Sequence, residues 1–191
     1  LHGSGLWLLG FMRDDVPWDP LRDFAPITLA VTSPNVVVVN PSLPVNSIKD
    51  LIALAKARPG QLNDAGGQSG TASHLAGELF KAMTGVEMVR IPYKGVGPAI
   101  NSLIAGETQV SFTNPSAAMP HIKSGKLRAL GVTSAAPSAM YPDMPTVAAS
   151  GLPGYEAVSI LGMFAPGKTP AAIVNRLNAD IARFLKTPET K

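Results

Sequence analysis

The chain has 191 residues, with 16 lysines and arginines against 13 aspartates and glutamates, and a formal net charge of +3. It contains no cysteine, which excludes disulfides, thiolate metal sites and cysteine nucleophiles. Apolar residues make up 46% of the chain, which is enough to bury a core and excludes a disordered tail. A net charge of +3 over this length is too weak to indicate a nucleic-acid-binding protein.

The two ends of the sequence carry no recognisable targeting or membrane segment. No basic region precedes an apolar run, so no signal peptide is visible. No stretch approaches the roughly 18 apolar residues that a membrane span needs. The chain begins with Leu1 rather than Met, and its strongest helical pattern extends almost to Lys191. We therefore expect a fragment of a longer protein.

Short apolar runs typical of strands alternate with helical patterns through most of the chain. Strands are predicted at 27–31, 36–39, 62–65, 88–91, 109–113, 127–132 and 158–164. Helices are predicted from the N-cap Ser47 to Pro59, from Thr71 to Gly85, around 100–104 and 119–122, and after an N-cap at Thr169. This alternation is typical of an α/β fold whose sheet is mainly parallel.

One segment, residues 133–157, interrupts the alternation with several prolines and no clear periodicity. A loop of this length in a compact unit is usually functional or connects two domains.

The most informative loop is residues 66–71, where a predicted strand ends and a helix begins. Helix N-termini leave backbone N–H groups unpaired and bind anions, and glycines let a ligand approach the backbone closely. Ser69, Thr71 and Ser73 add hydroxyl groups. The alternative is an ordinary turn capped by Thr71, and loop shape alone favours that alternative. The loop matches neither a P-loop nor a dinucleotide-binding fingerprint, nor the nucleophile elbow of the hydrolases.

Three further loops have the same small, polar character, at residues 3–5, 93–95 and 114–116. Lys94 could provide a cation for a carboxylate, although most lysines simply lie on a solvated surface. Loops that follow parallel strands meet at one edge of the sheet, where ligands bind. Several such loops together favour an anion-binding cleft.

The sequence offers little for catalysis. The histidines, at positions 2, 74 and 121, do not have the spacing of metal ligands, and no acidic residue stands in a loop that singles it out. A serine–histidine–acid triad remains open, because sequence spacing does not determine one. We expect no metal and no cofactor.

Many blocks of the sequence together resemble the substrate-binding receptors of tripartite tricarboxylate transporters, the Bug receptor family. The resemblance extends through nearly the whole chain. Its motifs are PWDP at 17–20, DFAP at 23–26, SPNV at 33–36, the region 47–60, SHLAGELF at 73–80, IPYKG at 91–95, PHIKSGKLRAL at 120–130, PTV at 145–147, GLPGYE at 151–156, and the prolines at 166 and 170.

The resemblance implies a periplasmic-binding-protein fold of type II, with two α/β domains and a ligand cleft between them. Domain 1 would comprise residues 1–34 and 157–191 and would be incomplete, because the family's opening segment and closing helices have no counterpart here. Domain 2 would comprise residues 35–156. The implied protein is a periplasmic receptor without enzymatic activity, which closes on a small organic acid or acidic amino acid and presents it to membrane permease subunits. No nucleic acid and no membrane insertion of this chain are expected.

The resemblance also implies which residues hold the ligand, mainly through loop backbone amides and waters. The first loop departs from the commoner polar version at Leu6 and Trp7. The implied ligand-binding residues are Gly3, Ser4, Gly5, Ser69, Gly70, Thr71, Ser73 and His74, with Tyr93, Lys94, Gly95, Asn114 and Ser116 as their neighbours.

Two alternatives to a transport receptor remain. One is a carboxylate sensor for a signalling partner, which the sequence alone does not distinguish from a receptor. The other is a hydrolase or acyl-transfer enzyme that uses Ser69 or Ser73 with Lys94 or His74 as its base. Such an enzyme would need its nucleophile and base within hydrogen-bond reach.

Overall fold

The computed structural model describes residues 3–187, and the chain divides into two compact units. One unit combines Leu1–Thr32 with Ser159–Lys191, and the other is the continuous segment Ser33–Val158. His2 and the end of the predicted C-terminal helical pattern at Lys191 lie outside the described residues.

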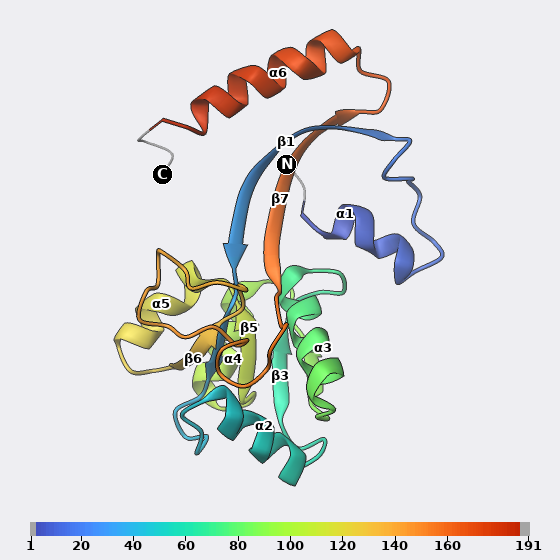
Figure 1. The fold of residues 1–191 in the computed structure, drawn as a ribbon. Coiled ribbons are helices and arrows are strands. Elements are labelled where there is room, and N and C mark those ends of the chain that lie inside the picture. Colours follow the sequence, from blue (N-terminus) through green and yellow to red (C-terminus); the bar gives the residue numbers. More distant parts are fainter. Residues whose placement is uncertain (1–2, 188–191) are drawn as a thin grey trace. The chain divides into compact units, whose positions relative to one another are not determined.

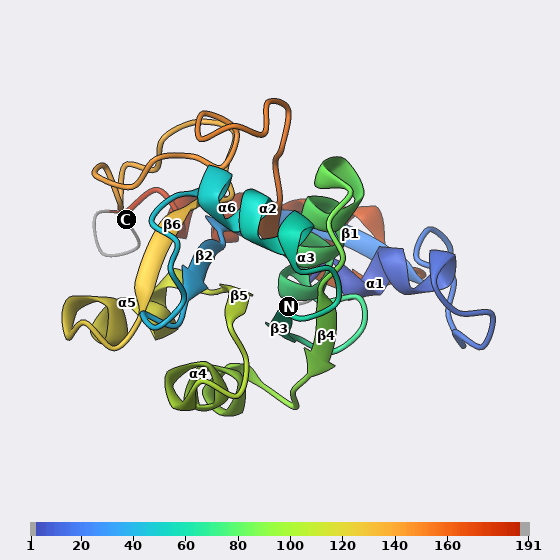
Figure 2. The ribbon, with the colours of Figure 1, turned by 90° about the horizontal axis from the view of Figure 1, so that it is seen from below.

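The continuous unit (Figure 1) is built on a five-stranded sheet in the order β4-β3-β5-β2-β6, and these strands are labelled in Figure 2. β3 pairs in parallel with β4 and β5, whereas β2 runs antiparallel to both of its neighbours, β5 and β6. The carboxyl ends of β3, β4 and β5 therefore lie at one edge of the sheet. The strands are β2 (Val36–Val39), β3 (Asn63–Gly66), β4 (Val89–Pro92), β5 (Val110–Thr113) and β6 (Arg128–Val132).

The reversed direction of β2 follows from the helix that comes after it. α2 (Ile48–Ala57) joins the end of β2 to the start of β3 at the same edge of the sheet. In contrast, α3 (Ala72–Thr84), α4 (Val96–Ala105) and α5 (Pro115–Lys123) each return the chain to the opposite edge, which is what parallel strands require. The predicted parallel arrangement thus applies to β3–β6 and not to β2.

Helices cover both faces of this sheet, with α2 and α3 on one face and α4 and α5 on the other (Figure 2). All four residues of β2 are fully buried. Because successive side chains of a strand point to opposite faces, Val37 and Val39 pack with α2 and α3, while Val36 and Val38 pack with α4 and α5. The predicted strand at 36–39 is thus a central strand, and its continuous apolar run fits burial on both faces.

The ends of the helices follow from individual residues. The Ser47 hydroxyl accepts a hydrogen bond from the Asp50 amide at 3.1 Å and caps α2. The Thr71 hydroxyl accepts one from the His74 amide at 3.3 Å and caps α3. α3 ends at Gly85, whose φ of +68° is a left-handed conformation that glycine adopts without strain.

The segment 133–157, predicted to lack periodic structure, forms no helix or strand, although Thr146 makes an isolated bridge to Val132. The segment is nevertheless anchored in the core. Tyr155 is fully buried against Phe80, with the ring centroids 6.3 Å apart, and its hydroxyl donates to the Ala76 carbonyl at 2.9 Å. This long connection therefore packs against α3 and helps to fix that helix.

The other unit contains α1 (Gly5–Leu8), a 3-10 turn (Leu9–Phe11), most of β1 (Phe24–Pro34) and of β7 (Val158–Pro166), and α6 (Ala171–Phe184). β1 pairs with β7 in a two-stranded sheet. Its small apolar cluster centres on Phe164, whose ring lies 5.9 Å from that of Trp7 and 6.5 Å from that of Phe24. The Trp18 indole donates to the Leu6 carbonyl at 2.9 Å, which closes the N-terminal turn over the cluster.

α6 differs from its prediction at its N-terminus. Its N-cap is Pro170 rather than Thr169, so the proline stands one position earlier relative to the helix. The apolar side chains of Ile173, Leu177 and Phe184 in α6 are exposed, and no residue of the helix is buried. Among the described residues, none of the helices combines the length and the apolar character needed to cross a membrane.

Candidate functional site

A pocket of about 200 Å³ opens in the continuous unit where β3, β4 and β5 end. The loops after β3 and β4 both border it, and the Tyr93 amide donates to the Gly66 carbonyl at 3.1 Å, which ties the two loops together. The residues around 69 and around 94 thus belong to one crevice. The pocket is lined by Ala65, Gly67, Gln68, Thr71, Ser73, Tyr93, Lys94, Gly95, Val96, Ala99, Ser111 and Thr113.

Residues 66–71, named here the glycine-rich turn, form one wall of the pocket. A Cβ on Gly67 would collide with the Thr71 hydroxyl, so the turn is too tight for a side chain at that position. Gly70 has a φ of +81°, which favours glycine. The Thr71 hydroxyl donates to the Gln68 carbonyl at 2.8 Å while it caps α3. The capped turn and the pocket wall, two alternatives in the sequence, are therefore the same structure.

The electrostatic character of the pocket is positive. The first turns of α3 and α4 both contribute to the lining, through Ser73 and through Val96. Helix N-termini carry a partial positive charge and unpaired N–H groups. The exposed Lys94 adds a full charge, and the lining described here contains no aspartate or glutamate. Such an environment suits a small anion.

The opposite wall comes from the neighbouring strands and from Tyr93. Ser111 and Thr113 alternate with Val110 and Phe112 on β5, so their side chains share the face that borders the pocket. The Ser111 hydroxyl donates to the Ala65 carbonyl at 2.9 Å. The Tyr93 hydroxyl lies 2.6 Å from the Ser102 hydroxyl, to which it donates.

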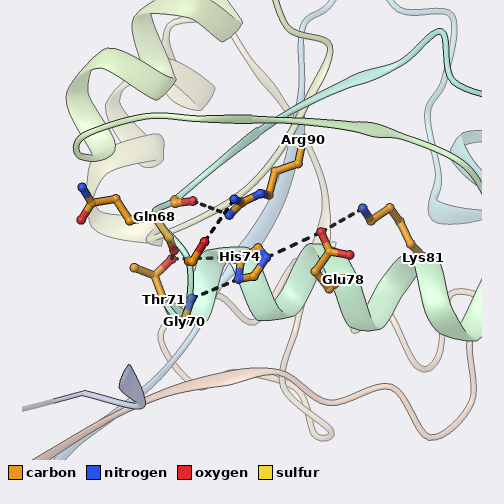
Figure 3. A network of polar contacts seen from close by, with 9 residues as sticks. Gln68, Gly70, Thr71, His74, Glu78, Lys81 and Arg90 are labelled. Atoms are coloured by element: carbon orange, nitrogen blue, oxygen red, sulfur yellow. Dashed lines mark hydrogen bonds and ion pairs between the residues drawn. The ribbon is translucent and has the colours of Figure 1, made fainter. Parts of the chain in front are cut away.

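Behind the glycine-rich turn lies a network of charged and polar side chains (Figure 3). Arg90 donates to the Gly67 carbonyl at 3.1 Å and to the Ser69 hydroxyl at 3.3 Å. The Gly70 amide donates to His74 Nδ1 at 3.1 Å. His74 Nε2 lies 3.7 Å from the Glu78 carboxylate, which also pairs with Lys81 at 2.9 Å.

Of the residues predicted to bind the ligand, Thr71, Ser73, Tyr93, Lys94 and Gly95 line the pocket. Ser69, Gly70 and His74 belong to the glycine-rich turn or to the network behind it, and are not part of the pocket lining.

The remaining predicted residues lie elsewhere in the described chain. Asn114 caps α5, where its side chain accepts bonds from the Ser116 amide and hydroxyl, both at 2.8 Å, and neither residue lines the pocket. Gly3, Ser4 and Gly5 belong to the other unit, at the start of α1.

Sequence reasoning missed several residues of the lining and the network. Ser111 and Thr113 had a usable signal, namely two polar side chains on the same face of a predicted buried strand at the edge where ligands bind. Arg90 gave no such signal, because it lies within a strand 21 residues from Ser69 and reaches the turn only in the folded chain.

The geometry gives no support to acyl-transfer chemistry. His74 Nδ1 accepts the Gly70 amide, and the Ser69 hydroxyl interacts with Arg90. Within residues 3–187, no hydrogen bond joins Ser69 or Ser73 to His74 or Lys94. The same residues contain no cluster of histidine and acidic side chains that could hold a metal ion.

Comparison with known proteins identifies the family. A family model described as "Tripartite tricarboxylate transporter family receptor" matches residues 4–191. Protein BugT of Bordetella pertussis is 38% identical over 92% of this chain and 54% of BugT. The chain spans about half the length of the curated relatives it matches.

Two solved structures of similar proteins contain a carboxylate ligand. Rpa4515 of R. palustris, determined with adipate, is 40% identical with a TM-score of 0.81 over 91% of this chain and 58% of that chain. MatC of Rhodopseudomonas palustris, determined with bound malate, is 26% identical with a TM-score of 0.84 over 99% of this chain and 63% of that chain. The α/β architecture is that of periplasmic solute-binding proteins. The chain therefore belongs to the tripartite tricarboxylate transporter receptor family, the family that includes the Bug proteins, whose members are solute-binding receptors and not enzymes.

Proposed function

We propose that this chain binds a small carboxylate, an organic acid or an acidic amino acid, as part of a periplasmic receptor for a tripartite tricarboxylate-type transporter. The observation that carries the proposal is the pocket at the ends of β3, β4 and β5, where two helix N-termini and Lys94 meet without an acidic residue in the lining. Family membership and the adipate and malate ligands of similar proteins support the same ligand class.

The size of the pocket agrees with a small metabolite. Pockets for drug-sized ligands range from roughly 300 to 1,000 Å³. The pocket found here, about 200 Å³, suits a carboxylate group with a few attached atoms. One carboxylate of the ligand would accept hydrogen bonds from N–H groups of the glycine-rich turn and from the Ser73 hydroxyl. Lys94 would lie near its negative charge. Hydrogen bonds between a charged acceptor and N–H groups are about twice as strong as neutral ones.

We also propose that the chain contributes to two domains of the receptor. Residues 35–156 would form the ligand-binding domain described here, and residues 1–34 with 157–191 would contribute to a second domain. Gly3, Ser4 and Gly5 stay predicted ligand contacts of that second domain. Permease subunits in the membrane would receive the ligand, and the receptor would act in the periplasm.

Titration calorimetry of the full-length gene product tests the proposal. We expect adipate, malate or glutamate to bind, and the uncharged diamide of adipic acid to fail, because the pocket recognises a negative charge. Absence of binding for every carboxylate of a broad panel, or equal binding of the acid and its diamide, would contradict the proposal.

A further inference from the structure

The glycine-rich turn depends on two side chains that are not part of the pocket lining. Arg90 donates hydrogen bonds to Gly67 and Ser69, and His74 accepts one from Gly70 (Figure 3). Three of the six residues of the turn are therefore hydrogen-bonded to side chains that do not line the pocket. A turn that offers backbone N–H groups to a ligand must keep them oriented before the ligand arrives, because ordering the turn on binding would cost affinity.

Arg90 reaches the turn because Gly66 has no side chain. A Cβ at Gly66 would lie 2.8 Å from Arg90 Cγ, closer than such atoms can approach. The Arg90 side chain therefore occupies the space that a side chain at position 66 would need. Its guanidinium then contacts two points of the turn at once, the Gly67 carbonyl and the Ser69 hydroxyl. A lysine amine has no such rigid planar fork and could not match both contacts as well.

His74 holds the turn only in its neutral form. It is buried, and its Nδ1 accepts the Gly70 amide at 3.1 Å. An imidazole nitrogen accepts a hydrogen bond only when it carries no proton, so the neutral ring has its proton on Nε2, on the side of Glu78. A protonated ring would present an N–H to the N–H of Gly70, and that hydrogen bond would be lost.

We propose that Arg90 and neutral His74 are positioning residues for the carboxylate-binding turn, and that protonation of His74 releases the Gly70 amide and weakens ligand binding. The ligand part of this inference rests on the function proposed above, whereas the coupling between His74 and Gly70 does not.

The charges around His74 set the direction of its titration. Burial and then Arg90 lower the pKa of His74, Glu78 opposes them, and Lys81 adds to the lowering. Asp64 on β3 interacts with the same three charged residues. The neutral ring is therefore favoured at neutral pH, and the hydrogen bond to Gly70 is lost only as the solution becomes acidic.

A simple charge effect would act in the opposite direction. A protonated His74 adds a positive charge close to the pocket, which would strengthen the binding of an anion at acidic pH. The positioning role predicts weaker binding of the anion there. The sign of the pH dependence thus distinguishes a residue that orients the turn from one that only adds charge.

The first experiment needs no ligand. Nuclear magnetic resonance of the isotope-labelled protein should show the tautomer protonated on Nε2 at pH 8. The Gly70 amide signal should move on acidification with the same midpoint as the His74 ring. A ring protonated on Nδ1 at pH 8, or a Gly70 signal that does not follow the ring, would overturn the proposal.

The second experiment measures adipate and malate affinity at pH 8 and pH 5 for the native protein and His74→Asn. The Asn side chain places an oxygen near the site of Nδ1 and does not titrate. We expect the affinity of the native protein, divided by that of His74→Asn, to fall roughly fivefold between pH 8 and pH 5. Titration of the ligand and of Asp64 is common to both proteins and cancels in the ratio. Equal ratios at both pH values, or stronger binding by the native protein at pH 5, would overturn the proposal.

Arg90 has a control in Arg128, which donates to two backbone carbonyls, those of Leu43 and Val45 at 3.2 and 2.9 Å, in a segment that contributes no residue to the pocket lining. We expect Arg90→Lys to weaken adipate binding roughly fivefold and Arg128→Lys to leave it unchanged. Equal effects of the two variants would overturn the role of Arg90. If the native protein bound no carboxylate at all, the proposed function would fail, while the resonance experiment would still decide the coupling of His74 to Gly70.

Discussion

Asp64 lies directly beneath Gly77, and the two residues leave no space for a side chain between β3 and α3. A Cβ at Gly77 would lie 2.6 Å from Asp64 Oδ2 and 3.4 Å from the Phe112 ring. Asp64 is almost fully buried, and its Oδ1 has no hydrogen-bond partner among residues 3–187. The close approach of α3 to the sheet, which sets the wall of the pocket, thus depends on a glycine above a buried carboxyl group.

Substituting Gly77 should therefore destabilise the protein. Alanine normally stabilises a helix interior relative to glycine, but at Gly77 its methyl group would overlap Asp64 and force α3 away from β3. We expect Gly77→Ala to lower the free energy of unfolding by about 1–3 kcal/mol in urea denaturation. Gly97→Ala in α4 is the control, because among the described residues no atom outside its own turn of helix lies within 4 Å of its Cβ position, and it should stabilise by up to about 1 kcal/mol. Equal effects of the two variants would refute the steric account.

The buried Asp64 should make the stability of the protein depend on pH. Burial raises the pKa of Asp64 from 3.8 to about 7, although Lys81 and Arg90 partly oppose the change. Since the folded-state pKa lies above the unfolded value, the folded state holds the proton more tightly. The contribution of Asp64 to the stability of the folded state is complete below about pH 4 and is lost as the pH rises through 7.

Asp64→Asn removes this titration. We expect the variant to gain stability relative to the native protein as the pH rises from 5 to 8, by an amount on the order of a few kcal/mol. Chemical denaturation at a series of pH values measures the difference. Parallel curves for the two proteins across this range would show that Asp64 does not titrate as described.

Tyr155 should contribute to stability through its hydroxyl as well as its ring. The hydroxyl donates to the Ala76 carbonyl inside the core, and burial raises the pKa of Tyr155 above its ordinary value. Tyr155→Phe removes the donor and should cost about 1–2 kcal/mol of unfolding free energy. Tyr141→Phe, at a half-buried position of the same long connection, should cost less. A Tyr155→Phe variant as stable as the native protein would exclude a role for this bond.

Lys94 should contribute to affinity through long-range attraction. It is exposed at the pocket, so its interaction with a bound carboxylate is screened by salt. We expect Lys94→Gln to weaken malate binding severalfold at low ionic strength and to reduce the salt dependence of the affinity. Lys126→Gln, an exposed lysine outside the pocket lining, should bind like the native protein. If both variants lost affinity equally, net charge rather than the pocket would be responsible.

Local signals in the sequence predicted much of the fold. Ser47, Thr71 and Gly85 mark the ends of α2 and α3 by capping chemistry that acts within a few residues. The direction of β2 could not be predicted in this way, because alternation of strands and helices does not specify at which edge a helix returns the chain.

The candidate site was predictable only in part, for the same reason. The loops at 66–71 and 93–95 are visible in the sequence as small polar segments after strands, and both border the pocket. The contact of Arg90 with Ser69, and the burial of Asp64 beneath Gly77, arise from the packing of strands and helices. Neither has a signature in the local sequence.

A crystal structure of the full-length protein with adipate or malate tests the central claim most directly. We expect one ligand carboxylate within hydrogen-bond distance of backbone N–H groups of residues 67–69 and of the Ser73 hydroxyl, with Lys94 close by. A ligand held entirely by other residues, with this pocket occupied only by water, would contradict it.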